Sequence, residues 1–274
     1  PLSVVNSGPT LKWSVSGGTT IPEQEINDPT LDLSGNSGIA TITITSDFGF
    51  SGLTVLNFIN DNGENSEIET IDVTKAEELE ELDLRFNNLT VLDVSQNVAL
   101  TKLVVRDNPA LTLLDISNNP LLDFIRADGA QLASFSAGSN PLLDYVRVAN
   151  NEIPTVDLDQ LLNDLDGYGL SNGSLFIANN TGDLTSAAQP AYDNLIAKGW
   201  TIDVDAPPVA VVETIILTTT STSNAWSPLS VVNSGPTLKW SVSGGTTIPE
   251  QEINDPTLDL SGNSGIATIT ITSD

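Results

Sequence analysis

Two aspartates, Asp203 and Asp205, have the types and spacing for metal chemistry, in the segment TIDVDAPP. Alternate residues of a strand point to one side, so we expect both carboxylates to face the same way. The two prolines that follow stiffen a joint between domains, and carboxylate oxygens at such a joint suit calcium. The alternative is that these acids only cap a strand end in water. The pattern indicates calcium as the candidate cofactor, with no other cofactor expected.

The chain offers little for catalysis. It contains no histidine and no cysteine, which removes the usual general base, the thiol nucleophile and the commonest transition-metal ligands. It has no HExxH motif, no phosphate-cradling glycine loop and no dinucleotide-binding fingerprint. The abundant acids fall at positions expected to be exposed, unlike the paired carboxylates of a glycosidase. We therefore expect no enzymatic activity.

The charge balance restricts the partners. Nine basic residues stand against 36 acidic residues, a net charge of −27. Such a polyanion repels nucleic acid and anionic membranes, so neither is expected as a partner. No apolar run long enough to cross a bilayer is visible, so no membrane insertion is expected.

Residues 79–158 contain a run of short apolar pairs with one residue between the two members. Successive pairs are ten or eleven residues apart, which predicts a solenoid with one pair inside each coil. The pairs are Leu82/Leu84, Leu92/Val94, Leu103/Val105, Leu114/Ile116, Ile125/Ala127, Phe135/Ala137, Val146/Val148 and Val156/Leu158.

The residue between the two members of each pair should point to the opposite face, toward solvent. We expect these middle positions to form one mostly charged ladder on the open face of a parallel sheet. If the solenoid binds a ligand, this ladder is the candidate surface. Its charged members are Asp83, Asp93, Asp115, Arg126, Arg147 and Asp157.

Asparagines recur three residues after the second apolar residue of most pairs, where the chain must turn. An Asn side chain there can hydrogen-bond turn backbone that would otherwise be buried without a partner. These predicted turn residues are Asn87, Asn97, Asn108, Asn119, Asn140 and Asn151.

The motif LxxLxLxxNxL, as in LTLLDISNNPL, resembles a bacterial leucine-rich repeat of the short kind, over residues 53–204. Residues 159–204 resemble the segment that closes such repeats. The resemblance implies a short helix from about residue 159, a strand at 175–178, a second helix near 186–198 and a last strand, WTIDV. Gly199 stands where a C-terminal cap glycine belongs.

Residues 1–49 show period-two alternation typical of antiparallel strands. Leu11, Trp13 and Val15 alternate with polar residues, and so do Ile42 and Ile44. The phrase GIATITITSDFGFSGLT resembles the last strand of an immunoglobulin-like β-sandwich that leads into a leucine-rich repeat. We expect the apolar faces of residues 1–49 to need an opposing sheet.

Residues 1–47 recur letter for letter as residues 228–274, a period of 227. A strand expected in 209–222 precedes the second copy, so the early strands beside the first copy should come from a preceding unit. We therefore predict a mainly β chain with short helices, repeated in tandem. Its parts are residues 1–49, the later part of a β-sandwich; residues 50–205, a short-coil solenoid with an α/β C-terminal cap; and residues 206–274, the β-sandwich of the next repeat.

The combination of sandwich and leucine-rich repeat resembles giant repetitive surface proteins of gliding bacteria that use type IX secretion, including grappling-hook filaments. This resemblance implies an extracellular location on the bacterial cell surface. It implies a structural unit of a filament or adhesin, with further copies of itself as partners along the chain and laterally. Two alternatives stay open: a module that binds a glycan or protein ligand on the solenoid face, and a bacteriophage tail or adhesion fibre.

Overall fold

The computed structural model describes residues 2–17, 21–25, 40–47, 49–58, 68–208, 213–219, 238–244, 247–252 and 267–273. The chain divides into two compact units, Pro1–Pro208 and Val209–Asp274, and each is described by itself. Among the described residues, no helix has the length and apolar character needed to span a membrane.

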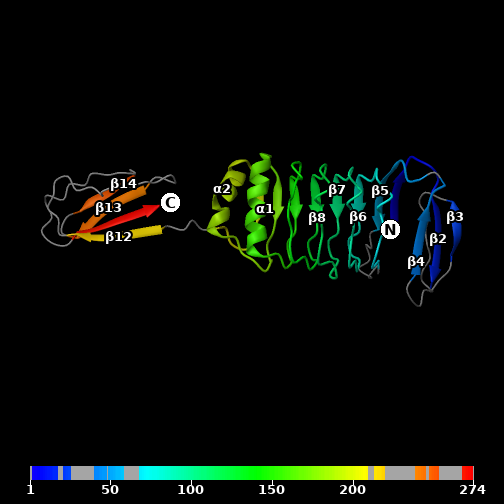
Figure 1. The fold of residues 1–274 in the computed structure, drawn as a ribbon, viewed down its shortest axis with the longest axis horizontal. Coiled ribbons are helices and arrows are strands. Elements are labelled where there is room, and N and C mark those ends of the chain that lie inside the picture. Colours follow the sequence, from blue (N-terminus) through cyan, green and yellow to red (C-terminus); the bar gives the residue numbers. More distant parts are fainter. Residues whose placement is uncertain are drawn as a thin grey trace. The chain divides into compact units, whose positions relative to one another are not determined.

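Unit 1 is dominated by an eight-stranded sheet whose strands lie side by side like rungs (Figure 1). The order is β1-β5-β6-β7-β8-β9-β10-β11, with β1 antiparallel to β5 and each later pair parallel. The strands are β1 Leu2–Asn6, β5 Leu53–Phe58, β6 Glu81–Asp83, β7 Lys102–Val104, β8 Phe124–Arg126, β9 Tyr145–Arg147, β10 Ser174–Phe176 and β11 Thr201–Asp203.

The strand register gives the true length of one coil. Leu82 is in register with Leu103, and Leu103 with Ile125, steps of 21 and 22 residues. The prediction of one apolar pair per coil of ten or eleven residues was therefore wrong. Each coil contains two pairs, one on the sheet and one on the opposite side, because the chain must return before the next strand can pair.

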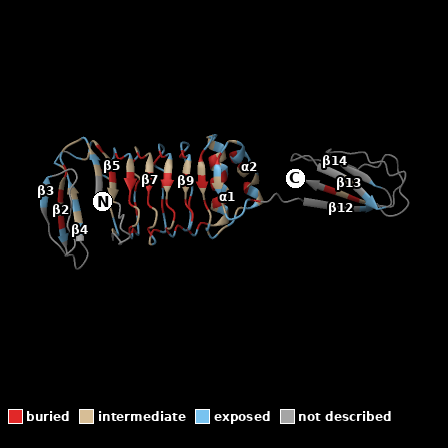
Figure 2. Ribbon diagram, turned by 180° about the vertical axis from the view of Figure 1, so that it is seen from behind, coloured by how far each residue is buried: buried red, intermediate tan, exposed pale blue. Residues whose placement is uncertain are grey.

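Both sets of pairs face the same core. Leu82 and Leu84 on the sheet side are buried, and so are Leu92 and Val94 on the return side. Figure 2 shows this buried interior running through the stack of strands. Apolar residues from both sides thus close each coil, which is where most of the burial free energy of the solenoid arises.

Two helices close one end of the solenoid. Helix α1, Thr155–Tyr168, buries Leu158, Leu161, Leu162 and Leu165, and α2, Gln189–Ala197, follows the short 3₁₀ helix η1, Ser186–Ala188. The first helix begins earlier than predicted. The predicted strand pair Val156/Leu158 lies on it, and Val156 is 69% exposed.

Gly199 terminates the second helix as predicted, with a left-handed φ of 84° that favours glycine. Its N–H donates to Ile196 O at 2.9 Å, which pairs one of the last helical carbonyls. The chain then enters β11 at once, so this cap sets where the final strand of the sheet begins.

At the other end of the solenoid, strands from residues 1–49 form a three-stranded antiparallel sheet of order β3-β2-β4. Its strands are β2 Lys12–Gly17, β3 Ile21–Glu25 and β4 Ala40–Thr45. Trp13 is fully buried and belongs to the same hydrophobic core as Leu53 and Leu56 of the solenoid. The apolar faces of residues 1–49 were expected to need an opposing sheet, but Trp13 packs in one core with the end of the solenoid. That early strands come from a preceding unit stays a prediction.

Unit 2 contains a four-stranded antiparallel sheet of order β12-β15-β13-β14. Its strands are β12 Glu213–Thr219, β13 Leu238–Gly244, β14 Ile248–Glu252 and β15 Ala267–Ser273. The strand expected in 209–222 is thus present as β12. The mainly β character with short helices is confirmed, whereas an immunoglobulin-like sandwich remains a prediction.

Candidate functional site

The outer face of the parallel sheet is the candidate site. Because the register is constant, side chains at equivalent positions line up in columns that cross the strands. One column runs through Glu81, Lys102, Phe124, Tyr145 and Ser174, and the next runs through Asp83, Val104, Arg126, Arg147 and Phe176.

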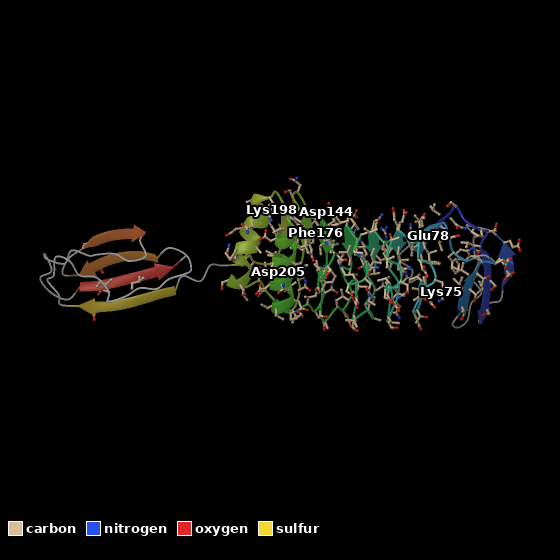
Figure 3. The ribbon with its side chains drawn as sticks, turned by 45° about the horizontal axis from the view of Figure 1, so that its top comes forward. Lys75, Glu78, Asp144, Phe176, Lys198 and Asp205 are labelled. Atoms are coloured by element: carbon tan, nitrogen blue, oxygen red, sulfur yellow. The ribbon has the colours of Figure 1, made fainter. Side chains whose placement is uncertain are left out.

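Three partly exposed rings, Phe124, Tyr145 and Phe176, form what we call the aromatic row. Phe124 stacks on Tyr145 with ring centroids 4.2 Å apart and planes 9° apart, and Tyr145 lies 5.6 Å from Phe176 at 44°. Phe176 lies near the helical end of the solenoid (Figure 3). Contacts of this kind hold the rings in fixed positions and form a short apolar row on a polar face.

Cations flank this row. Lys102 Nζ lies 5.9 Å from the Phe124 ring centroid, and Arg147 Cζ lies 4.9 Å from that of Phe176. These distances are within the range of cation–π attraction. Both cations are themselves paired with acids, Lys102 Nζ with Glu81 at 3.2 Å and Arg147 Nε with Asp128 at 3.4 Å. The aromatic row is therefore flanked by ion pairs.

Two arginines on this face share one buried acid. Arg126 Nε and Arg147 Nε lie 3.3 and 3.4 Å from the two carboxylate oxygens of Asp128, which is buried. Asp128 was not among the predicted site residues, since it lies two residues beyond the middle position of its strand. The pairing orients both guanidinium groups and leaves them partly exposed.

Asp83, a predicted ligand-facing residue, is only 4% exposed. Its carboxylate accepts hydrogen bonds from Arg85, including one from the backbone N–H at 3.2 Å. Arg85 encloses this carboxylate, so Asp83 is buried within the sheet face. The prediction that Asp83 is solvated was therefore wrong.

Asp93 and Asp115 lie on the return side of the coils and not on the sheet, so the predicted single ladder is two separate rows. Each accepts the backbone N–H two residues later, Ser95 N and Ser117 N, both at 2.9 Å. Asp157 lies in the first turn of α1 and accepts the N–H of Phe135 at 3.3 Å. All three carboxylates accept hydrogen bonds from backbone, and the exposed Asp93 and Asp115 belong to a row on the return side, separate from the sheet face.

The hydrogen bonds from Ser95 lower the pKa of Asp93, chiefly through the hydroxyl and then through the backbone N–H. For Asp115 the backbone N–H of Ser117 comes first, with its hydroxyl second, and the pKa is again lowered. Both effects arise because hydrogen bonds to a carboxylate favour its charged form.

The six asparagines lie in the interior in two rows, one at each edge of the coils. At the sheet edge, the Nδ2 of Asn108 donates to Val105 O at 2.8 Å and to Leu84 O of the preceding coil at 3.0 Å. At the other edge, the Nδ2 of Asn119 donates to Val94 O and Asn97 O, at 3.0 and 2.9 Å. The remaining members, which make equivalent bonds, are Asn87, Asn97, Asn140 and Asn151.

The predicted calcium ligands lie at the last strand. Asp203 ends β11 and is exposed, and Asp205 Oδ2 accepts the N–H of Asn179 at 2.7 Å. Within the described ranges, no group of three or more acids is arranged to hold a metal ion. Calcium takes six to eight oxygens, so Asp203 and Asp205 would need further ligands from water or from outside these ranges.

The segment GLSNG at 169–173 matches the letters of the nucleophile-elbow pattern GxSxG. It joins α1 to β10, helix to strand, whereas an elbow joins a strand to a helix. The chain also contains no histidine to activate the serine. The match therefore has no catalytic geometry behind it.

No protein-family model and no curated protein matches the chain. Among solved structures, the functional domain of InlJ from Listeria monocytogenes, which includes a cysteine ladder, is 20% identical with a TM-score of 0.40, over 88% of this chain and 48% of that chain. A leucine-rich-repeat protein from Leptospira interrogans is 18% identical with a TM-score of 0.36, over 50% and 40%. An internalin, InlF, from Listeria monocytogenes is 16% identical with a TM-score of 0.35, over 52% and 47%.

This chain thus covers less than half of each of these three chains. At these values the similarity indicates nothing about function. The leucine-rich-repeat fold rests on the chain itself: a parallel ladder of short strands, coils of 21 or 22 residues, and buried asparagines at the turns.

Proposed function

We propose that the chain is a structural unit of a long, repetitive extracellular filament or adhesin on a bacterial surface. The observation that carries this proposal is the identity of residues 1–47 with residues 228–274. Diversified binding modules differ from copy to copy at the surfaces that meet ligands. The recurring segment lies outside the solenoid, so its identity bears on the joint between units and favours a scaffold in which every joint is built alike.

The architecture is suited to spanning a distance and not to enclosing a ligand. Each coil bonds only to its neighbours, so a solenoid adds length coil by coil without changing the contacts already made. The second copy contributes one lysine and five acids, so one period carries a net charge of −23. A tandem array would therefore be a soluble polyanion whose chains repel one another until salt screens them.

The proposal predicts lateral association that strengthens with salt. Sedimentation of the purified chain should show larger species at marine ionic strength than at low ionic strength. A single species at every salt concentration would favour isolated threads over bundled filaments.

The decisive test of the repetitive scaffold is the complete reading frame, combined with labelling of intact cells. We expect several copies at a step of 227 residues, and surface labelling by an antibody against residues 68–208. A frame in which the recurrence occurs only at this one place would overturn the filament. Neighbouring virion genes, in place of export signals, would indicate the bacteriophage fibre.

A second candidate function is ligand binding on the sheet face, which the aromatic row favours. Three ordered rings, flanked by the ion-paired Lys102 and Arg147, suit a glycan or a protein ligand. A glycan array followed by calorimetry tests it. Tyr145→Ala should abolish binding, whereas Tyr192→Ala on α2 should leave it unchanged, and equal effects of both would remove the sheet face as the site.

A further inference from the structure

The chain contains one sequence in two surroundings. Strand β4 and the first six residues of β15 are identical, ATITIT, and β2 is identical to the last six residues of β13. In unit 2, β15 lies between β13 and β12. In unit 1, β4 pairs with β2 on one edge, and no described strand pairs with its other edge.

The two surroundings differ in burial. Ile269 and Ile271 of β15 are 0% and 7% exposed, whereas the same residues in β4, Ile42 and Ile44, are only partly buried. In the register of the β12–β15 pair, Leu217 stands opposite Ile269 and Ile215 opposite Ile271.

We propose that the open edge of β4 receives the strand equivalent to β12 from a preceding copy of this sequence. The inference rests on the proposed function in one respect, that such a copy exists. In the donated register, Thr214 stands opposite Thr45, Ile216 opposite Thr43, and Thr219 opposite Ala40, by equivalence with β15. Each repeat boundary is then one sheet built from two consecutive units.

The chemistry of the two strands fits this pairing. An unpaired edge presents a row of N–H and C=O groups that template another strand. Strand β4 carries no charged residue, and β12 carries only Glu213, at its first position. The acidity of the whole chain therefore places little repulsion on this edge. In the chain itself, β12 is already paired with β15, so a β12 strand on the edge of β4 has to come from another copy.

The test uses the complete 274-residue chain and a synthetic peptide of residues 209–222, VAVVETIILTTTST, with two lysines appended for solubility. Amide hydrogen exchange is followed in 40–45 and, as an internal reference of identical sequence, in 267–272. Saturating peptide should slow exchange in 40–45 at least about tenfold and leave 267–272 unchanged, because that strand already has its partner. A peptide with Ile216→Pro, which removes a donor from the centre of the strand, should have no effect.

A chain with Thr43→Pro should lose the response to peptide, whereas the matched Thr270→Pro chain should keep it in 40–45. Unchanged exchange in 40–45 with the wild-type peptide would overturn the inference, as would protection elsewhere in unit 1. Either result would leave the repetitive scaffold untouched, since that proposal is tested by copy number and cell labelling. Conversely, a single-copy reading frame combined with peptide protection would overturn the scaffold and retain the edge as a strand acceptor.

Discussion

The backbone N–H of Leu89 donates to Oδ1 of Asn108, 19 residues later, at 3.0 Å. The same amide donates from Nδ2 to carbonyls of its own coil and of the preceding coil. One buried side chain therefore joins two coils through four backbone groups, the N–H of Leu89 and the carbonyls of Leu84, Val105 and Arg106. Since Leu89 and Asn108 are both fully buried, no water can replace these bonds without opening the edge.

Asn108→Ala should lower the free energy of unfolding by about 3 kcal/mol, because it leaves buried N–H and C=O groups without partners. Urea denaturation followed by circular dichroism measures the change. Asn88→Ala, at an exposed neighbour, is the control and should change stability by less than about 0.5 kcal/mol. Equal losses in the two variants would show that the buried amide is not what holds the turn.

Gly173 lies where the chain passes under Trp200. A Cβ on Gly173 would lie 2.6 Å from two atoms of the Trp200 ring and 2.7 Å from Asp144 O. Gly173→Ala should therefore cost about 1–3 kcal/mol through overpacking at the last coils. Gly167→Ala, in α1 with open space at its Cβ, should instead stabilise by about 0.5–1 kcal/mol. Thermal melting of both variants checks the opposite signs.

Acid should weaken the return side of the coils. The pKa values of Asp72, Asp93 and Asp115 are lowered below the ordinary value of 3.8 by hydrogen bonds from Thr74, Ser95 and Ser117. For carboxyls with lowered pKa, the stabilisation is present above 3.8 and is lost as the pH falls through the folded values. Melting temperatures between pH 5 and 2 should fall less steeply for Asp93→Asn/Asp115→Asn than for the wild type. Asp183→Asn, outside this row, should follow the wild-type curve.

Calcium at the joint remains a prediction for Asp203 and Asp205. If both bind the ion, calorimetry should detect calcium in the 274-residue chain and lose it in Asp203→Asn/Asp205→Asn. Addition of a chelator to the wild type should increase the maximum dimension in small-angle scattering by loosening the joint, while circular dichroism stays constant. Heat of binding that persists in the double variant would place the ion elsewhere, and no heat at all would remove calcium from the joint.

The apolar pairs were predictable from their spacing. Each extended stretch buries alternate residues, whether it lies on the sheet side or on the return side of a coil. The coil length was not predictable, since Leu82/Leu84 and Leu92/Val94 have the same spacing although they lie on opposite sides of the core. A one-dimensional pattern does not show whether the chain has returned between two pairs. Trp13 illustrates a second limit: alternation indicates a buried face, but what covers that face depends on a contact with residues about 40 positions away.

The aromatic row was only partly predictable. Phe124 and Tyr145 follow the solenoid step, but Phe176 enters the sheet only after the insertion of α1, which breaks that step. Its contact with Tyr145 could have been found only by aligning the strand of the closing segment with the strands before it.

The constant step of the sheet has a consequence for how such a protein changes over generations. Between Leu82 and Val146, each coil offers its neighbours nearly the same apolar surface and the same pairing edge. An in-frame duplication or loss of one coil therefore joins surfaces that already match, and both ends keep their own covers. The length of the solenoid can then change by whole coils over generations, without any change in the contacts at either end.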